Sequence, residues 1–189
     1  MRHCAERWPG VPLSEDRQPD SWSVRLVDRA HNRADFTCGE PELDRYLREA
    51  ARQSSVSDMG KTYVLSPANN PNIVAGFYTL AAGSVLLTSL PPGVAKGVPR
   101  YPQVPIVLLA RLGIATAFQR KGLGEWLLLD AFGRARDVAN ILGARAVVVD
   151  ALHEQAAAFY VKYGFVPLID APLTLILSMS VVRTALQAR

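Results

Sequence analysis

The sequence predicts a single α+β domain, with a mixed sheet that carries helices on both faces. Two patterns support this fold class. Strand patterns typical of antiparallel pairing come first in the chain, and a β-α-β-α-β succession follows from residue 104. With 189 residues, of which 49% are hydrophobic and 20% charged, the chain is large and apolar enough to build one sizeable core.

The first half of the chain is expected to form a strand, a helix and a hairpin. Residues 22–26 alternate between apolar and polar side chains, as a half-buried strand does. Pro41 then opens a segment with apolar residues at helical spacing, namely Leu43, Tyr46, Leu47 and Ala50. Segments 61–66 and 73–87 are rich in β-branched and aromatic residues, and 67–72 between them has turn composition, which predicts a hairpin.

The second half is expected to alternate strands and helices after an irregular connection over residues 88–103, which is rich in proline and glycine. The elements expected after it are a strand over 104–114, a helix over 122–140, a strand over 144–150, a helix over 154–163 and a strand pair over 165–169 and 173–179. Residues 1–20 lack periodicity and are expected to form a flexible N-terminal arm. The domain is therefore predicted to span 21–182, with a C-terminal tail over 183–189.

Cysteine content and hydropathy exclude several classes of protein. Two cysteines, Cys4 and Cys38, cannot form a disulfide framework, and neither has the spacing of a zinc site, so we expect no metal. No signal peptide is visible, and charged residues and prolines interrupt the two longest apolar stretches, 104–118 and 165–182. We therefore expect a cytoplasmic protein with no membrane partner.

Positive charge is concentrated in the middle of the chain. Between Met59 and Gly124 there is no Asp or Glu. The basic residues of this stretch are Lys61, Lys96, Arg100, Arg111, Arg120 and Lys121. Solvated surfaces normally mix both signs of charge, so the stretch favours an anionic ligand. The alternative is a middle segment that is simply apolar and buried.

A glycine loop lies between an apolar strand and the helix expected from residue 122. It consists of Gln119, Arg120, Lys121, Gly122, Leu123 and Gly124. The two glycines let an anion approach the free N–H groups at the start of a helix, and the basic residues add charge. A Walker loop is excluded because Glu125 follows the second glycine, and a dinucleotide fingerprint because Leu127 replaces its third glycine. The loop therefore predicts a pyrophosphate site, against the alternative of a purely structural turn.

The loop matches Q/R-x-x-G-x-G, and residues 156–165 match A-x-x-F-Y-x-x-x-G-F. With both motifs in order, the sequence resembles the Gcn5-related N-acetyltransferases (GNAT), which implies a three-layer GNAT fold with a mixed, mostly antiparallel sheet. Further blocks over 36–180 resemble the tRNA-acetylating toxins, among them 36–47, 76–80, 108–112 and 147–151. This group implies a ribbon-helix-helix antitoxin as partner, operator DNA bound only through the antitoxin complex, and a homodimer.

The resemblance also implies acetyl-CoA as co-substrate and assigns roles to residues. Backbone groups of Leu112, Gly113 and Ile114 would bind the pantetheine arm, and the loop 119–124 would bind the pyrophosphate. Tyr160 is the candidate general acid, because a phenol with a pKa near ~10 holds its proton until a thiolate forms. The alternative is that Tyr160 is only a core aromatic. His153, where many members have Asn, would act as a base or cap the following helix.

The acceptor is predicted to be an α-amine. An α-amine titrates near ~7.7 to 8, well below a lysine side chain, and this suits a site whose sequence shows no nearby base. A base supplied by a helix elsewhere in the chain is the open alternative. For a tRNA acceptor, Lys96, Arg100 and Arg111 are the expected phosphate contacts. Arg45, Arg48 and Arg52 on the first helix extend that track, contact an acidic antitoxin tail, or form a solvated helix face.

These observations predict an acetyl-CoA-dependent N-acetyltransferase that acetylates aminoacyl-tRNA and so blocks translation. Two alternatives stay open. One is a small-molecule or protein N-terminal acetyltransferase, in which the basic middle serves only the cofactor. The other is a binding module with little activity that acts as a co-repressor with its antitoxin.

Overall fold

The computed structural model describes residues 21–187 and contains one seven-stranded sheet with the order β1-β2-β3-β4-β5-β7-β6. The strands are β1 (Trp22–Leu26), β2 (Lys61–Pro67), β3 (Gly76–Leu86), β4 (Gln103–Ile114), β5 (Ala146–Asp150), β6 (Val166–Pro167) and β7 (Thr174–Ser178). Every neighbouring pair is antiparallel except β4 and β5, which are parallel. The predicted mixed, mostly antiparallel sheet is confirmed. The predicted N-terminal arm, 1–20, lies outside the described residues.

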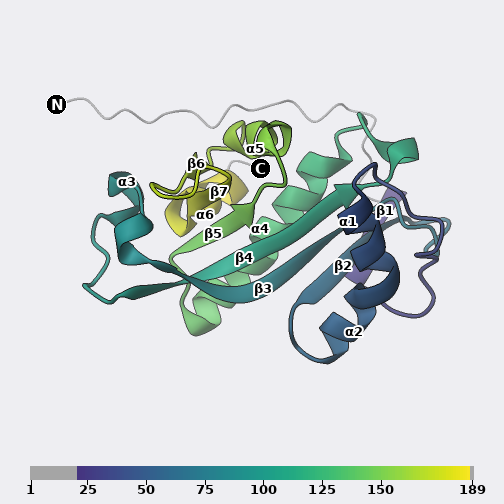
Figure 1. Cartoon of the computed structure of the whole chain (residues 1–189). Coiled ribbons are helices and arrows are strands. Elements are labelled where there is room, and N and C mark those ends of the chain that lie inside the picture. The colour runs from purple at the N-terminus through teal and green to yellow at the C-terminus, as the bar shows by residue number, and fades with distance from the viewer. Residues whose placement is uncertain (1–20, 188–189) are drawn as a thin grey trace.

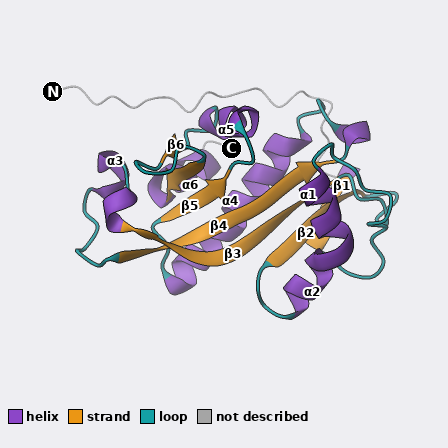
Figure 2. Cartoon of the chain, in the orientation of Figure 1, coloured by secondary structure: helices purple, strands orange, loops and turns teal. Residues whose placement is uncertain are grey.

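Helices cover both faces of the sheet. They are α1 (Pro41–Arg45), α2 (Ala51–Val56), α3 (Pro92–Ala95), α4 (Leu123–Leu142), α5 (Glu154–Val161) and α6 (Met179–Gln187). In Figure 1, α4 lies behind the sheet, and α1 and α2 lie in front of it. Figure 2 shows the same three layers by element type. Within residues 21–187, no helix is long and apolar enough to span a membrane.

Each face of the sheet has its own apolar core. Behind the sheet, Leu127, Leu128 and Phe132 of α4 pack against a cluster that includes Tyr78 and Leu109 of the central strands. In front of it, a smaller cluster combines Leu43 and Leu47 of the first helix with Phe36, Phe77 and Val64. These two clusters fix the helices on opposite sides of β3 and β4.

The first helix is continuous from Pro41 to Val56 and contains a π-helical turn at Tyr46–Ala50, where Ala51 N–H donates to the carbonyl of Tyr46. Such insertions widen a helix locally and often occur at functional sites. The sequence predicted the helix but not this turn.

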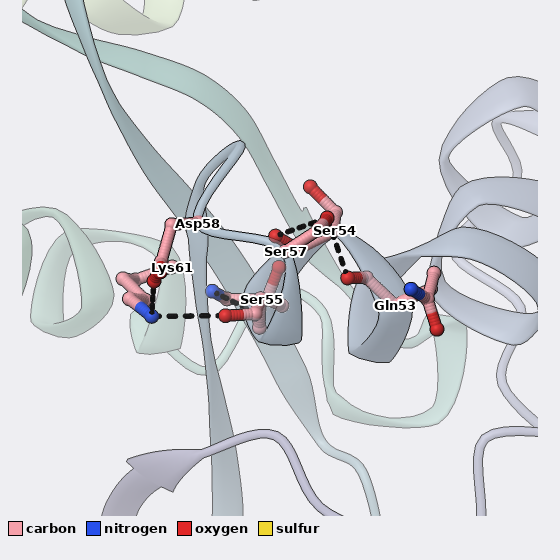
Figure 3. A network of polar contacts seen from close by, with 7 residues as sticks. Gln53, Ser54, Ser55, Ser57, Asp58 and Lys61 are labelled. Carbon is pink, nitrogen blue, oxygen red and sulfur yellow. Dashed lines mark hydrogen bonds and ion pairs between the residues drawn. The ribbon is translucent and has the colours of Figure 1, made fainter.

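Polar contacts fix the corner between α2 and β2 (Figure 3). Lys61 donates to the carbonyl of Ser55 at 2.9 Å and pairs with Asp58, which has a left-handed φ of 58°. The Ser57 hydroxyl donates to the carbonyl of Gln53 at 2.9 Å, and Thr62 N–H donates to Ser55 Oγ at 3.0 Å. The corner therefore holds the C-terminal end of the first helix against the sheet.

Three expectations from the sequence need correction. Strand β3 begins at Gly76, because residues 68–75 still belong to the turn, where an isolated bridge joins Asn32 and Ile73. The connection over 88–103 is not wholly irregular, since it contains α3. The tail predicted over 183–189 is helical as far as Gln187, because Val182 and Ala185 of α6 pack into the core. Residues 188–189 of that tail lie outside the described residues.

Candidate active site

A bulge in β4 opens the sheet next to β5. In the β3–β4 ladder Thr79 pairs with Arg111 and Leu80 with Leu109, so Ala110 is an extra residue on β4. The parallel pairing of β4 with β5 ends at the same level, at Leu109 and Val149. Bulges bend the strand that carries them, and beyond this one no described strand pairs with that edge of β4. Residues 110–114 therefore present main-chain groups to an open groove.

A cavity of about 600 Å³ occupies this opening. It is lined by β4 from Leu109 to Ile114, by α1 and its π-helical turn, and by the segment from Asp150 into α5. Leu112, Gly113 and Ile114, predicted as the pantetheine site, all lie in its wall. Cys38 lines it too, but burial raises the pKa of the Cys38 thiol to about 12, so the thiol stays protonated at neutral pH. A cysteine nucleophile is therefore disfavoured.

Tyr160 lines the same cavity from α5. Its side chain is only 8% exposed and packs edge-on against Phe159 and Phe165, with ring centroids 5.1 Å and 5.5 Å away. Burial raises the pKa of the Tyr160 phenol above its usual value. The phenol therefore keeps its proton at neutral pH, and the role of Tyr160 as general acid stays a prediction. The Tyr160 ring packs against the core on one side and borders the cavity on the other.

His153 caps helix α5. Its Nδ1 accepts a hydrogen bond from Ala156 N–H at 3.2 Å, and Nε2 lies 3.1 Å from Oε1 of Glu40. Of the two roles that the sequence left open, the cap is confirmed.

The glycine loop turns from β4 into α4 through two left-handed residues. Arg120 has φ of 59° and Gly122, the N-cap, has φ of 70°. Gly124 lies in the first turn, where an added Cβ would contact the Phe159 ring at 3.6 Å. Arg120, Lys121, Gly122, Leu123 and Gly124 do not line the cavity, which Gln119 alone reaches from this loop. The loop therefore forms an exposed helix N-terminus beside the cavity, as a pyrophosphate site at the end of an extended ligand requires.

Two side chains of the loop have other partners than those expected. Gln119 Nε2 donates to the carbonyls of Cys38, at 2.8 Å, and Ile114, at 3.0 Å. Both amide hydrogens of Gln119 are used in this way, so it shapes the loop instead of donating to an anion. Lys121 donates to the carbonyl of Ala117 at 3.1 Å.

The three basic residues predicted to bind phosphates do not lie together in the structure. Arg111 lines the cavity, with its guanidinium carbon 3.7 Å from the centroid of the Tyr46 ring. Lys96 and Arg100 are exposed, follow α3 and lie outside the cavity wall. In Figure 1, α3 is at the opposite end of β4 from α1. Only Arg111 can therefore act at the cavity itself.

Acidic residues that the sequence analysis did not expect also line the cavity, namely Glu40, Glu42, Glu49 and Asp150. A base from a helix elsewhere in the chain was left open by the sequence, and these carboxylates are the candidates for it. The signal was present, since Glu42, Arg45, Tyr46 and Glu49 recur at helical spacing and face the cavity together. The charge argument used only the acid-free stretch 59–124, which does not include the first helix.

Comparison with known proteins agrees with this geometry. Residues 75–167 match the acetyltransferase (GNAT) domain. The chain is 39% identical over 155 residues to a tRNA-acetylating toxin of Mycobacterium tuberculosis, a match that covers 82% of this chain and 90% of that protein. The chain belongs to the GNAT acetyltransferases, in the group of tRNA-acetylating toxins.

Two solved structures share the fold of this GNAT acetyltransferase. AtaT complexed with acetyl-methionyl-tRNAfMet has a TM-score of 0.80 and 25% identity, covering 87% of this chain and 98% of that one. AtaTR bound with acetyl-CoA has a TM-score of 0.77 and 25% identity, covering 88% and 98%. The predicted three-layer GNAT fold is confirmed.

The site of this GNAT acetyltransferase has the form that acetyl-CoA needs. The groove beside residues 110–114 offers main-chain groups to an extended amide-bearing arm, and the exposed start of α4 suits a pyrophosphate. Within the described residues there is no cluster of three or more metal-ligating side chains.

Proposed function

We propose that this acetyltransferase transfers the acetyl group of acetyl-CoA to the α-amine of aminoacyl-tRNA and so blocks translation in the cytoplasm. The observation that carries the proposal is the likeness to a tRNA-acetylating toxin over 90% of its length, together with a cavity that combines an open strand edge and a buried tyrosine. An acetylated α-amine cannot form a peptide bond, which accounts for a toxic effect.

When bound, acetyl-CoA supplies the acetyl group as a thioester. Main-chain groups of Leu112, Gly113 and Ile114 would hold its arm in the groove, and the N-terminus of α4 with Arg120 would hold its pyrophosphate. Tyr160 would give its phenolic proton to sulfur as the carbon–sulfur bond breaks. Its raised pKa keeps that proton in place until sulfur becomes basic.

The aminoacylated end of the tRNA would enter the cavity beside Arg111 and Tyr46, whose side chains stack there. Lys96 and Arg100 would then contact phosphates outside the cavity. Eight strand residues separate the start of β4 from Arg111, a span of roughly 26 Å at ~3.3 Å per residue, which a nucleic-acid stem can bridge. Such contacts would make the affinity for tRNA fall with salt.

We propose further that a ribbon-helix-helix antitoxin binds this protein, that the complex binds operator DNA through the antitoxin, and that the toxin is a homodimer. These proposals rest on membership in the toxin group. Co-expression with the product of a neighbouring short reading frame, followed by co-purification and by sizing with and without DNA, tests them.

The decisive experiment is incubation of the purified protein with labelled acetyl-CoA and total charged tRNA. We expect label to appear in one or a few N-acetyl-aminoacyl esters, which mild base releases from tRNA. Label that enters peptides or small amines but not charged tRNA would contradict the proposed acceptor. Absence of transfer together with absence of acetyl-CoA binding in calorimetry would contradict the enzymatic role altogether.

A further inference from the structure

A contact between two distant segments spans the cavity. Glu40 immediately precedes α1, and His153 immediately precedes α5, 113 residues later in the chain. Oε1 of Glu40 lies 3.1 Å from Nε2 of His153, and both side chains line the cavity. The contact therefore joins the helix that covers the front of the sheet to the helix that carries Tyr160.

The cap of α5 decides where the proton of this contact lies. Nδ1 of His153 accepts from Ala156 N–H at 3.2 Å, so it carries no proton. A neutral imidazole with a bare Nδ1 has its proton on Nε2, which then donates to Oε1 of Glu40. Both ring nitrogens are thus used, and His153 is not free to act as a base. The carboxylate of Glu40 remains an acceptor.

The second oxygen of that carboxylate has no recorded partner. Among the described residues no hydrogen bond reaches Oε2 of Glu40, and its side chain is 41% exposed at the cavity. The other acids of the cavity are held differently. Asp150 accepts from the Thr174 hydroxyl at 2.8 Å and is exposed, and Glu42 and Glu49 are exposed without a described side-chain partner. Glu40 alone is oriented by a residue of α5.

Helix α5 brings this carboxylate and Tyr160 to one wall. His153, Ala156 and Tyr160 all line the cavity, which is the i, i+3, i+7 spacing of a single helix face. Seven residues correspond to a rise of about 10 Å along the helix. In acetyl transfer the attacking nitrogen and the leaving sulfur are bound to the same carbon. The wall therefore carries both a proton acceptor, Glu40, and a proton donor, Tyr160.

We propose that Glu40 is the general base of the reaction and that His153 positions it; this inference rests on the proposed function. As the α-amine nitrogen bonds to the acetyl carbon, Oε2 of Glu40 takes one proton from nitrogen. As the carbon–sulfur bond breaks, Tyr160 gives its proton to sulfur. The proton on Glu40 then returns to the Tyr160 oxygen through water in the cavity. One proton leaves nitrogen and one reaches sulfur, so the exchange balances.

The test compares three variants with the parent protein in the assay with labelled acetyl-CoA and charged tRNA. Glu40→Gln keeps the acceptor for His153 but loses the base, so we expect kcat to fall by about 10²- to 10⁴-fold with acetyl-CoA binding unchanged in calorimetry. His153→Asn keeps a cap for α5 but is too short to reach Glu40. We expect its kcat to fall by about tenfold with the thermal midpoint and the KM for acetyl-CoA preserved. Glu154→Gln is the matched control, because Glu154 is exposed, next to His153 and outside the cavity wall, and it should keep parental kcat.

The outcomes separate the two proposals. A parent protein that acetylates charged tRNA while Glu40→Gln retains kcat within threefold would overturn the role of Glu40 and leave the proposed function standing. A His153→Asn variant that loses thermal stability but not kcat would reduce His153 to a helix cap and overturn its positioning role. A parent protein that acetylates no charged tRNA would overturn the proposed function and the inference with it.

Discussion

Replacement of Tyr160 by Phe separates the catalytic role of the phenol from its packing role. The ring contacts with Phe159 and Phe165 survive in the variant, because both involve the edge or face of the ring and not the hydroxyl. No hydrogen bond from the Tyr160 hydroxyl to a described residue is recorded, so the change leaves no polar group unpaired. We therefore expect the free energy of unfolding to change by less than about 1 kcal/mol, which corresponds to a thermal shift of roughly 2 to 4 °C at most.

The catalytic effect of Tyr160→Phe should be far larger. Loss of a general acid costs typically 10²- to 10⁴-fold in kcat, or about 2.7 to 5.4 kcal/mol of transition-state stabilisation. The KM values for both substrates should stay near those of the parent, since the ring remains in place. The pH dependence has a defined sign. Because burial raises the pKa of Tyr160, the proton is held below that pKa, and the parent should lose no activity through Tyr160 up to about pH 10.

The assay is initial-rate transfer from labelled acetyl-CoA to charged tRNA, with thermal unfolding measured in parallel. Tyr163→Phe is the matched control, because the same atom is removed three residues further on and Tyr163 does not line the cavity. A Tyr160→Phe variant that keeps kcat within threefold of the parent would refute the role of Tyr160 as general acid. A variant that loses activity only in proportion to a loss of folded protein would refute it equally.

Three more predictions concern stability, cofactor and tRNA. Burial acts to raise the pKa of Asp44, but hydrogen bonds from Cys38 N–H at 2.8 Å and the Thr37 hydroxyl at 2.9 Å hold it below its usual value. Asp44→Ala should therefore lower the unfolding free energy by about 2 to 4 kcal/mol at pH 7 in urea titrations, and the difference should shrink as pH falls below the ordinary Asp pKa of about 4 and through the lower pKa of native Asp44. Gly124→Val, which adds a branched side chain at the start of α4 where the pyrophosphate would approach the main chain, should weaken acetyl-CoA binding in calorimetry by about tenfold or more, and the protein should stay folded because the added Cβ lies 3.6 Å from Phe159, an ordinary contact. Lys96→Glu combined with Arg100→Glu should raise the KM for tRNA and flatten its dependence on salt while kcat stays parental; an unchanged KM would exclude these residues from the tRNA track.

The order of elements could be predicted from the sequence because hydrophobic periodicity reports which face of each segment is buried. The same reasoning missed α6, where Met179 closes an apolar strand and Val182 and Ala185 continue the apolar pattern at helical spacing. The strand pattern and the helix pattern overlap at this point, so neither of them shows where β7 ends and α6 begins.

Part of the site could be predicted from the sequence and part could not, and the difference between the two parts has a physical reason. The loop at 119–124 and Tyr160 lie in local motifs whose chemistry depends on neighbouring residues. The contact of Glu40 with His153 depends on how α1 and α5 pack across the sheet, which no local pattern encodes. The separation of Arg111 from Lys96 and Arg100 likewise follows from the length of β4 and not from composition.

The extra residue in β4 also changes which residue numbers face each side of the sheet. Up to Leu109, odd-numbered residues such as Val107 face α4, whereas after Ala110 the even-numbered Leu112 and Ile114 do so. Arg111 is thereby directed onto Tyr46 in front of the sheet. Deletion of Ala110 would leave Leu109 and Arg111 adjacent and on opposite faces, as they are now, so the side chains would keep their faces while the bulge that opens the sheet beside β5 would be lost. A single-codon loss at this point should therefore preserve the two cores and close the groove that residues 110–114 line, so that the protein folds but no longer binds an extended ligand there.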